Sequence, residues 1–225
     1  MARIIKKPEV RRNEILDVAQ RLVYQKGYEQ MTIQEIIDET HISKGAFYHY
    51  FDSKQALLEA LIERMGEEGV QLVSSILTDP KLNALQKLQS YFDSAMRWKT
   101  GQKAMMIALL NGWYSDDNAI VRQKELAAGK KIMVPLLKAV LCQGITEHLL
   151  ATPYPEQMAE VLVTLILGLS DTLAELILAG QAGNADLERV EATVAAYTYA
   201  IERVLGAVPD SLKLVDMETM KEWFT

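Results

Sequence analysis

The sequence of 225 residues contains one cysteine and three histidines. A lone thiol, Cys142, forms no internal disulfide, which suits a reduced cytoplasmic protein, and thiolate metal clusters are excluded. The histidines lack the paired spacing of metal ligands, so we expect no metal site and no cofactor. The sequence also lacks Ser/His/Asp or Cys/His catalytic sets, a glycine-rich phosphate loop and closely paired catalytic carboxylates. These absences argue against an enzyme.

Long hydrophobic runs are missing as well. The longest apolar run covers residues 161–169 and is interrupted by Thr164. It is about half of the roughly 20 residues that a helix needs to cross a bilayer, so we expect no membrane span.

Charge is unevenly distributed along the chain. The net charge is −6, yet residues 1–54 carry nine Lys and Arg against eight Asp and Glu, whereas the remainder carries 15 against 22. Five basic residues fall within the first twelve positions: Arg3, Lys6, Lys7, Arg11 and Arg12. A basic arm ahead of an acidic body suits a protein that presents one end to phosphate and repels it elsewhere.

Apolar residues recur every three or four positions throughout, and sustained period-2 alternation is absent, so the pattern predicts an all-α protein. Thr32 and Glu35 form a capping box that starts the second helix, and Ser43 opens the third. Asp52, with Gln55 three residues later, is predicted to cap the fourth. The helices are expected at about 8–26, 32–40, 43–51, 52–77, 82–99, 102–114, 117–148, 155–181 and 186–206.

The third helix has two chemically different faces. Phe47, Tyr50 and Phe51 point to one side at spacings of three and four, and are predicted to anchor the helix in the core. The opposite face combines a cation, a hydroxyl, an imidazole and a glycine: Lys44, Tyr48, His49 and Gly45. Such a face is suited to the major groove of DNA, because small residues allow close approach while polar groups reach bases or phosphates.

Three segments in order resemble the signature of the TetR family of bacterial transcriptional regulators. They read TIQEII at residues 32–37, HISKGAFYHYF at 41–51 and SKQALL at 53–58. The resemblance covers about residues 8–60. One departure is the turn, where many family members have Ala-Gly-Val and this chain has Thr-His-Ile at residues 40–42; Ile42 still supplies the apolar plug.

The resemblance implies a three-helix DNA-binding domain of the helix-turn-helix type at residues 1–53, and a helical domain for effector binding and dimerisation at residues 54–225. Thr32, Tyr48 and Lys54 would hold phosphates, and the third helix would face base edges. The predicted DNA-binding residues are Thr32, Ser43, Lys44, Gly45, Ala46, Tyr48, His49 and Lys54. Tyr50 is open to two interpretations, a core residue with its hydroxyl outward or a phosphate contact.

Beyond residue 60 the interpretation depends on patterns rather than motifs. The helix at 155–181 is apolar almost all round, which implies burial on both sides, and the helix at 186–206 has an apolar stripe beside small residues. The pair is predicted to form a four-helix dimer interface, although both helices would also suit the interior of a monomer. The predicted interface residues are Leu162, Ile166, Leu169, Val194, Tyr197 and Ile201. A two-fold dimer would place two recognition helices about 34–36 Å apart on a palindromic operator.

The central helices are rich in methionine and aromatic residues, which adapt to irregular apolar ligands. Ordinary core packing explains each of them equally well. The predicted pocket residues are Phe92, Met96, Met105, Met106, Leu109, Trp113, Tyr114 and Met133. The sequence therefore favours a cytoplasmic repressor that a small apolar effector releases from double-stranded operator DNA, and the alternative is a constitutive dimeric regulator without an effector.

Overall fold

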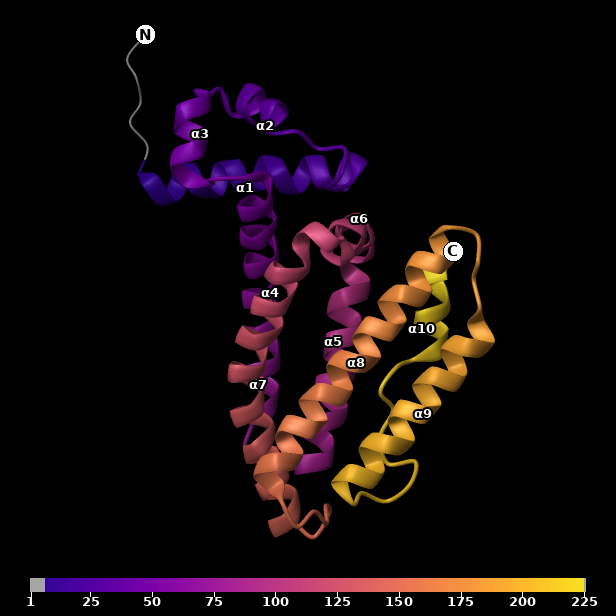
Figure 1. Ribbon diagram of the computed structural model, residues 1–225. Helices are drawn as coiled ribbons and strands as arrows, with labels where there is room; N and C mark the ends of the chain where they lie inside the picture. The colour runs from indigo at the N-terminus through magenta and orange to yellow at the C-terminus, as the bar shows by residue number, and fades with distance from the viewer. Residues whose placement is uncertain (1–6, 225) are drawn as a thin grey trace. The chain divides into compact units, whose positions relative to one another are not determined.

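The computed structural model describes residues 7–224, except for the side chain of residue 68, and this part of the chain contains helices but no β-strand. The prediction of an all-α fold is confirmed. The helices, drawn in Figure 1, are α1 Pro8–Lys26, α2 Ile33–Thr40, α3 Lys44–Tyr50, α4 Lys54–Leu77, α5 Ala84–Gly101, α6 Lys103–Tyr114, α7 Ala119–Thr146, α8 Pro155–Gln181, α9 Leu187–Leu205 and α10 Met217–Lys221, with 3₁₀ turns η1 at Asp116–Asn118 and η2 at Glu222–Phe224.

Most predicted helix ends agree with the structure, and the start of α4 requires a correction. The cap of α4 is Ser53, not Asp52, because the Ser53 Oγ accepts the Ala56 N–H at 3.0 Å. Serine and aspartate are both favoured N-cap residues, so the sequence alone does not show which of these two neighbours caps the helix. The short helix α10 was not predicted, since five residues carry too little periodicity to stand out.

The first of two compact units comprises residues 7–67 and 104–123 of the described chain. The apolar face of α1 is buried against α2, and α2 packs on α3. Large, fully buried side chains of this unit come from four helices and include Ile15, Leu16, Ile36, Phe47, Leu57, Leu58 and Leu61. The predicted boundary between residues 53 and 54 lies ahead of α4, whereas this unit extends into α4 and includes most of α6. The reason is that Leu57, Leu58 and Leu61 complete the same core.

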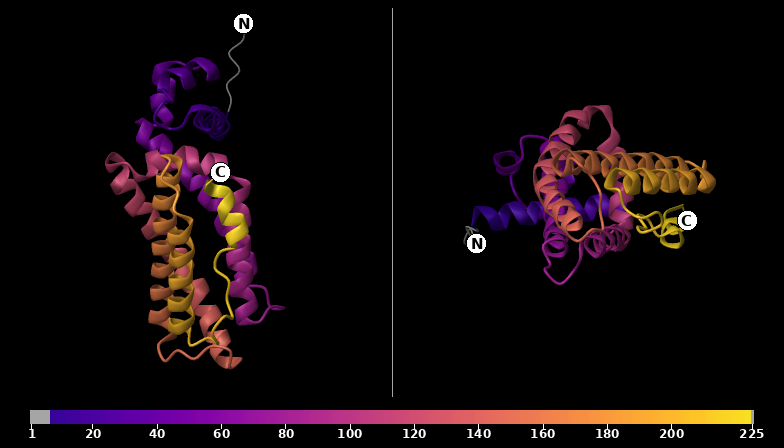
Figure 2. Two further views of the ribbon diagram at one scale, coloured as in Figure 1. Left: turned by 90° about the vertical axis from the view of Figure 1, so that its right-hand side faces the viewer. Right: turned by 90° about the horizontal axis from the view of Figure 1, so that it is seen from below.

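The second unit comprises residues 68–103 and 124–224 of the described chain. Helices α8 and α9 pack side by side along much of their length, as Figures 1 and 2 both show. The segment after α9 is held to the rest of the unit by several hydrogen bonds. The buried Glu202 carboxylate accepts the N–H groups of Asp210 and Leu212 at 3.1 and 3.0 Å, and the Trp223 Nε1 donates to Thr100 Oγ1 at 3.3 Å. The residues after α9 are therefore an integral part of the second unit.

Within residues 7–224, α8 is the one helix that is long and apolar enough to cross a membrane by length and composition. Its side chains Leu162, Leu169 and Ile177 are buried. Because α8 packs along α9, we interpret its apolar character as that of a core helix.

Candidate DNA-binding surface

The start of α2 is fixed by the predicted capping box. Thr32 Oγ1 accepts the Glu35 N–H at 3.3 Å, and Glu35 Oε2 accepts the Thr32 N–H at 2.9 Å. Lys26, at the end of α1, forms an ion pair with the same carboxylate. The bonds from Lys26 and Thr32 lower the pKa of Glu35 to about 2, so the carboxylate is charged at neutral pH. The N-terminus of α2 is thereby tied to the end of α1.

The turn between α2 and α3 is built around His41. This residue adopts a left-handed conformation (φ 52°, ψ 39°), and the amides of His41 and Ile42 both donate to the Ile37 carbonyl. The prediction that His41 is a turn residue is confirmed. A left-handed residue lets the chain reverse within two residues, which orients α3 relative to α2.

The two predicted faces of α3 are confirmed by burial. Phe47 is 0% exposed and Phe51 is buried beside it, with the two ring centroids 6.0 Å apart. Ser43 caps the helix, since its Oγ accepts the Ala46 N–H at 3.2 Å. Tyr50 is half-buried. The helix is thus anchored by its aromatic face and free on the other.

The outward face of α3 carries groups that can read or approach DNA. Its exposed residues are Lys44, Gly45, Tyr48 and His49, and Ala46 is half-buried. Tyr48 is 39% exposed and rests its ring edge-on against Phe47, at 5.4 Å between centroids. The His49 and Tyr50 rings lie 5.1 Å apart. Each of these rings therefore packs against a neighbouring ring, while Tyr48 and His49 remain exposed to solvent.

Lys54 begins α4 beside the turn between α1 and α2. Its Nζ donates to the Glu29 carbonyl at 3.0 Å and lies 4.4 Å from the centroid of the Tyr28 ring. Partial burial lowers the pKa of Lys54, and the Glu29 carboxylate opposes that shift. An ammonium has three N–H donors, so at least one remains for a phosphate.

The predicted basic arm is only partly described. Arg3 and Lys6 lie outside the described residues, and Lys7 is exposed. Arg11 pairs with Glu14 at 2.8 Å, while Arg12 lies 5.3 Å above the Phe51 ring. These two arginines therefore make stabilising contacts within the first unit.

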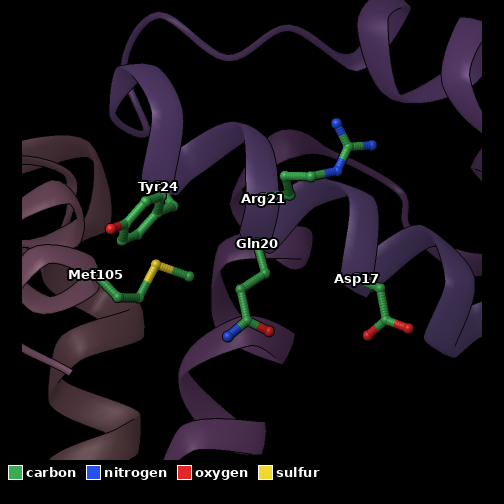
Figure 3. A pocket seen from close by; sticks show the side chains of 5 residues that line it. All are labelled: Asp17, Gln20, Arg21, Tyr24 and Met105. Carbon is green, nitrogen blue, oxygen red and sulfur yellow. The ribbon is translucent and has the colours of Figure 1, made fainter. Parts of the chain in front are cut away.

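The predicted pocket residues are divided between the two units. Met105, Met106, Leu109, Trp113 and Tyr114 belong to α6 in the first unit, and Phe92, Met96 and Met133 belong to α5 and α7 in the second. A groove of about 300 Å³ opens on the first unit, lined by Asp17, Gln20, Arg21 and Tyr24 of α1 and by Met105 of α6 (Figure 3). Met105 is the one residue of the predicted pocket that lines this groove.

The predicted dimer residues lie mainly inside the second unit. Leu162 and Leu169 of α8 and Val194 and Ile201 of α9 are buried in the single chain, and Ile166 and Tyr197 are half-buried. The sequence pattern identified apolar stripes but did not distinguish packing of α8 on α9 from packing on a partner. Among residues 7–224 no group of three or more His, Cys, Asp or Glu side chains is placed to hold a metal ion.

Comparison with known proteins identifies the arrangement. Residues 15–61 match the family described as bacterial regulatory proteins, tetR family. The transcriptional repressor NemR of Escherichia coli (strain K12) is 27% identical over 161 residues, which is 70% of this chain and 80% of NemR. Residues 15–61 are therefore a TetR-family domain, and most of the chain is similar to a TetR-family repressor.

Other TetR-family proteins extend the similarity beyond the DNA-binding helices. The transcriptional repressor DhaR of Mycobacterium sp. (strain GP1) is 22% identical over 152 residues, covering 68% of this chain and 76% of DhaR. A TetR-family regulator from Pectobacterium atrosepticum superposes with a TM-score of 0.63 at 18% identity, over 89% of this chain and 98% of that one. The second unit thus shares the helical fold of TetR-family proteins, and the α1–α3 helices are a helix-turn-helix DNA-binding element.

Sequence reasoning missed one buried residue beside this surface, Tyr28. No role was predicted for it from the sequence. In the structure the Lys54 ammonium forms a cation–π contact with the Tyr28 ring. No local pattern reveals this contact, because residues 28 and 54 meet only after α1 and α4 have packed.

Proposed function

We propose that the protein is a cytoplasmic transcriptional repressor, not an enzyme, that binds a palindromic operator as a homodimer and is released by a small apolar molecule. One observation carries the DNA-binding part: α3 buries Phe47 completely and presents Lys44, Gly45, Tyr48 and His49 outward. Side chains of this kind read base edges when a helix enters the major groove. We also propose that Ser43 and Ala46 contact the DNA, because they lie at the start of α3, where the helix would approach the DNA closely.

Phosphate contacts would flank this helix. The Thr32 amide is bonded to Glu35 and the Glu35 amide to Thr32, so the Ile33 and Gln34 amides of α2 are the donors left for a phosphate. Lys54 would supply a second contact and Tyr48 a third. Such contacts fix the position of the protein on DNA without reading sequence.

For dimerisation we propose the outer face of α9, next to the predicted residues Ile166 and Tyr197. Ala192, Ala195, Ala196 and Tyr199 are all exposed there. Small side chains let two helices approach closely, and Tyr199 would be covered by the partner. We expect light scattering after size exclusion to give twice the chain mass, and Ala195→Glu to give the mass of one chain.

The operator can be found without knowledge of the regulated gene. Purified protein is used to select DNA from a random-sequence duplex library, and we expect a palindrome whose half-sites are one helical turn apart. Operator release is then measured with a panel of apolar compounds. Failure to enrich any sequence would contradict the proposal, and release by none of the compounds would favour a regulator without an effector.

The Lys54→Ala variant is expected to weaken binding to all DNA sequences. Loss of one phosphate contact reduces the slope of log affinity against log salt by about 1. Fluorescence anisotropy between low and moderate salt measures the slope. An unchanged slope would contradict the assigned contact.

The His49→Ala variant is expected to change preference among operators instead. Removing a base contact costs about 1–3 kcal/mol at one position of the site and relaxes discrimination there. Affinities are compared for the selected operator, its single-base variants and random duplex. Equal losses on selected and random DNA would show that His49 does not read sequence.

A further inference from the structure

Tyr28 lies in the turn between α1 and α2 and is held from behind by α6. It is 6% exposed, and its backbone N–H donates to the Ala108 carbonyl at 3.3 Å. A Cβ atom on Gly112 would lie 2.4 Å from Cδ1 of the Tyr28 ring. The ring therefore rests directly on the α6 backbone, at a position that only glycine leaves open.

The hydroxyl of Tyr28 is fixed as well. It forms a hydrogen bond with the side chain of Asn118, which is itself 3% exposed. Asn118 Nδ2 donates to the Gly112 carbonyl at 2.8 Å and to Ser115 Oγ at 3.0 Å. Burial raises the pKa of Tyr28 to about 12 against the opposing effect of the Asn118 bond, so the phenol stays neutral at neutral pH.

The Tyr28 ring also contacts the start of α4. Lys54 Nζ lies 4.4 Å from the ring centroid, within the range of a cation–π contact, and is bonded to the Glu29 carbonyl. Gln55 makes a second tie, since its Nε2 donates to the Asp117 carbonyl of η1 at 2.8 Å. Two consecutive residues of α4 are thus connected to the α6–η1 segment: Lys54 through the Tyr28 ring, and Gln55 by a direct hydrogen bond.

We propose that Tyr28 is a positioning residue for DNA binding: clamped by Gly112 and Asn118, its ring holds the Lys54 ammonium where it meets an operator phosphate. A lysine side chain has many rotamers, and a contact that restricts them before binding lowers the entropic cost of the phosphate contact. This inference rests on the proposed phosphate contact of Lys54.

A double-mutant cycle tests the proposal on the full chain. The variants are Tyr28→Leu, Lys54→Ala and the two combined, with Tyr154→Leu as a control for loss of an exposed tyrosine on the second unit. Affinity for the selected operator is measured across a salt series. We expect Tyr28→Leu to weaken binding roughly threefold to tenfold and to lower the salt slope toward that of Lys54→Ala.

The decisive comparison is Tyr28→Leu made in the Lys54→Ala background. A positioning role predicts less than about a twofold further loss, because the group that Tyr28 positions is already absent. A further loss equal to that in the wild-type background would overturn the proposal, since Tyr28 would then act through packing alone. If Lys54→Ala leaves the affinity unchanged while the wild type binds its operator, the inference also fails, although the repressor function stands.

Tyr28→Phe and Asn118→Ala guard against simple misfolding. Tyr28→Phe keeps the ring and loses only the hydroxyl bond, so we expect a smaller loss of affinity than for Tyr28→Leu, again absent when Lys54 is alanine. Asn118→Ala removes the same bond together with those to Gly112 and Ser115, so its loss of affinity should be at least that of Tyr28→Phe. Additive losses for these mild variants in the Lys54→Ala background would equally overturn the proposal.

Discussion

Replacing Phe47 by alanine should cost about 3–5 kcal/mol of folding free energy and abolish operator binding. The side chain is 0% exposed and packs between helices of the first unit, where its ring meets those of Phe51 and Tyr48. Truncation removes the transfer free energy of the ring and leaves a cavity that its neighbours fill only in part. Total stabilities of proteins are about 5–15 kcal/mol, so this loss is a large fraction.

Thermal and urea unfolding followed by circular dichroism measure the loss. Tyr48→Ala is the matched control, because Tyr48 is the next residue of α3 but is 39% exposed, so its truncation should change stability by less than about 1 kcal/mol. Equal destabilisation by the two variants would contradict the assignment of Phe47 to the core and Tyr48 to the surface.

The contrast between these neighbours illustrates what the sequence could predict. Helix spacing places residues 47 and 51 on one face and 44 and 48 on another, and capping residues such as Thr32 and Ser43 mark where helices begin. These signals act within one or two turns, so they survive without knowledge of the tertiary structure. The helix-turn-helix region is dense in such signals, which explains why its helices and faces were predicted closely.

The second half of the chain lacked that local information. Leu162 and Ile201 belong to genuine apolar stripes, yet both are buried within one chain, and the outer face of α9 exposes alanines and Tyr199 instead. An apolar stripe indicates that one face of a helix is buried, but it does not identify the helix that covers this face. The predicted pocket residues had the same weakness, because methionine and aromatic side chains serve cores and ligand pockets equally.

Contacts between distant segments were also beyond the sequence. The bond from Gln55 to the Asp117 carbonyl joins residues that are far apart along the chain, as does the packing of Tyr28 on Gly112. A glycine within a helix has several explanations, from flexibility to close packing. Only the position of the Tyr28 ring selects one of them for Gly112.

Gly45→Leu is expected to leave the fold intact and yet to reduce operator affinity roughly tenfold to a hundredfold. Gly45 is exposed on α3, and a Cβ there would meet nothing within 4 Å. Leucine favours helix over glycine by about 0.8–1 kcal/mol, so thermal stability should be unchanged or higher. The added side chain projects from the face proposed to enter the major groove and prevents close approach, at the cost of about one base contact, or 1–3 kcal/mol.

Gly66→Leu provides the matched control for this experiment. Gly66 is also an exposed helical glycine where an added Cβ would meet nothing within 4 Å, but it lies twelve residues along α4 from Lys54, about 18 Å at 1.5 Å per residue. It should gain similar helix stability and retain operator affinity. Anisotropy titrations and thermal melts on both variants separate the two effects. Because Gly45→Leu leaves Phe47 and the core untouched, a loss of affinity without a loss of stability would locate the DNA contact on the outward face of α3, whereas full affinity in Gly45→Leu would remove that face from the interface.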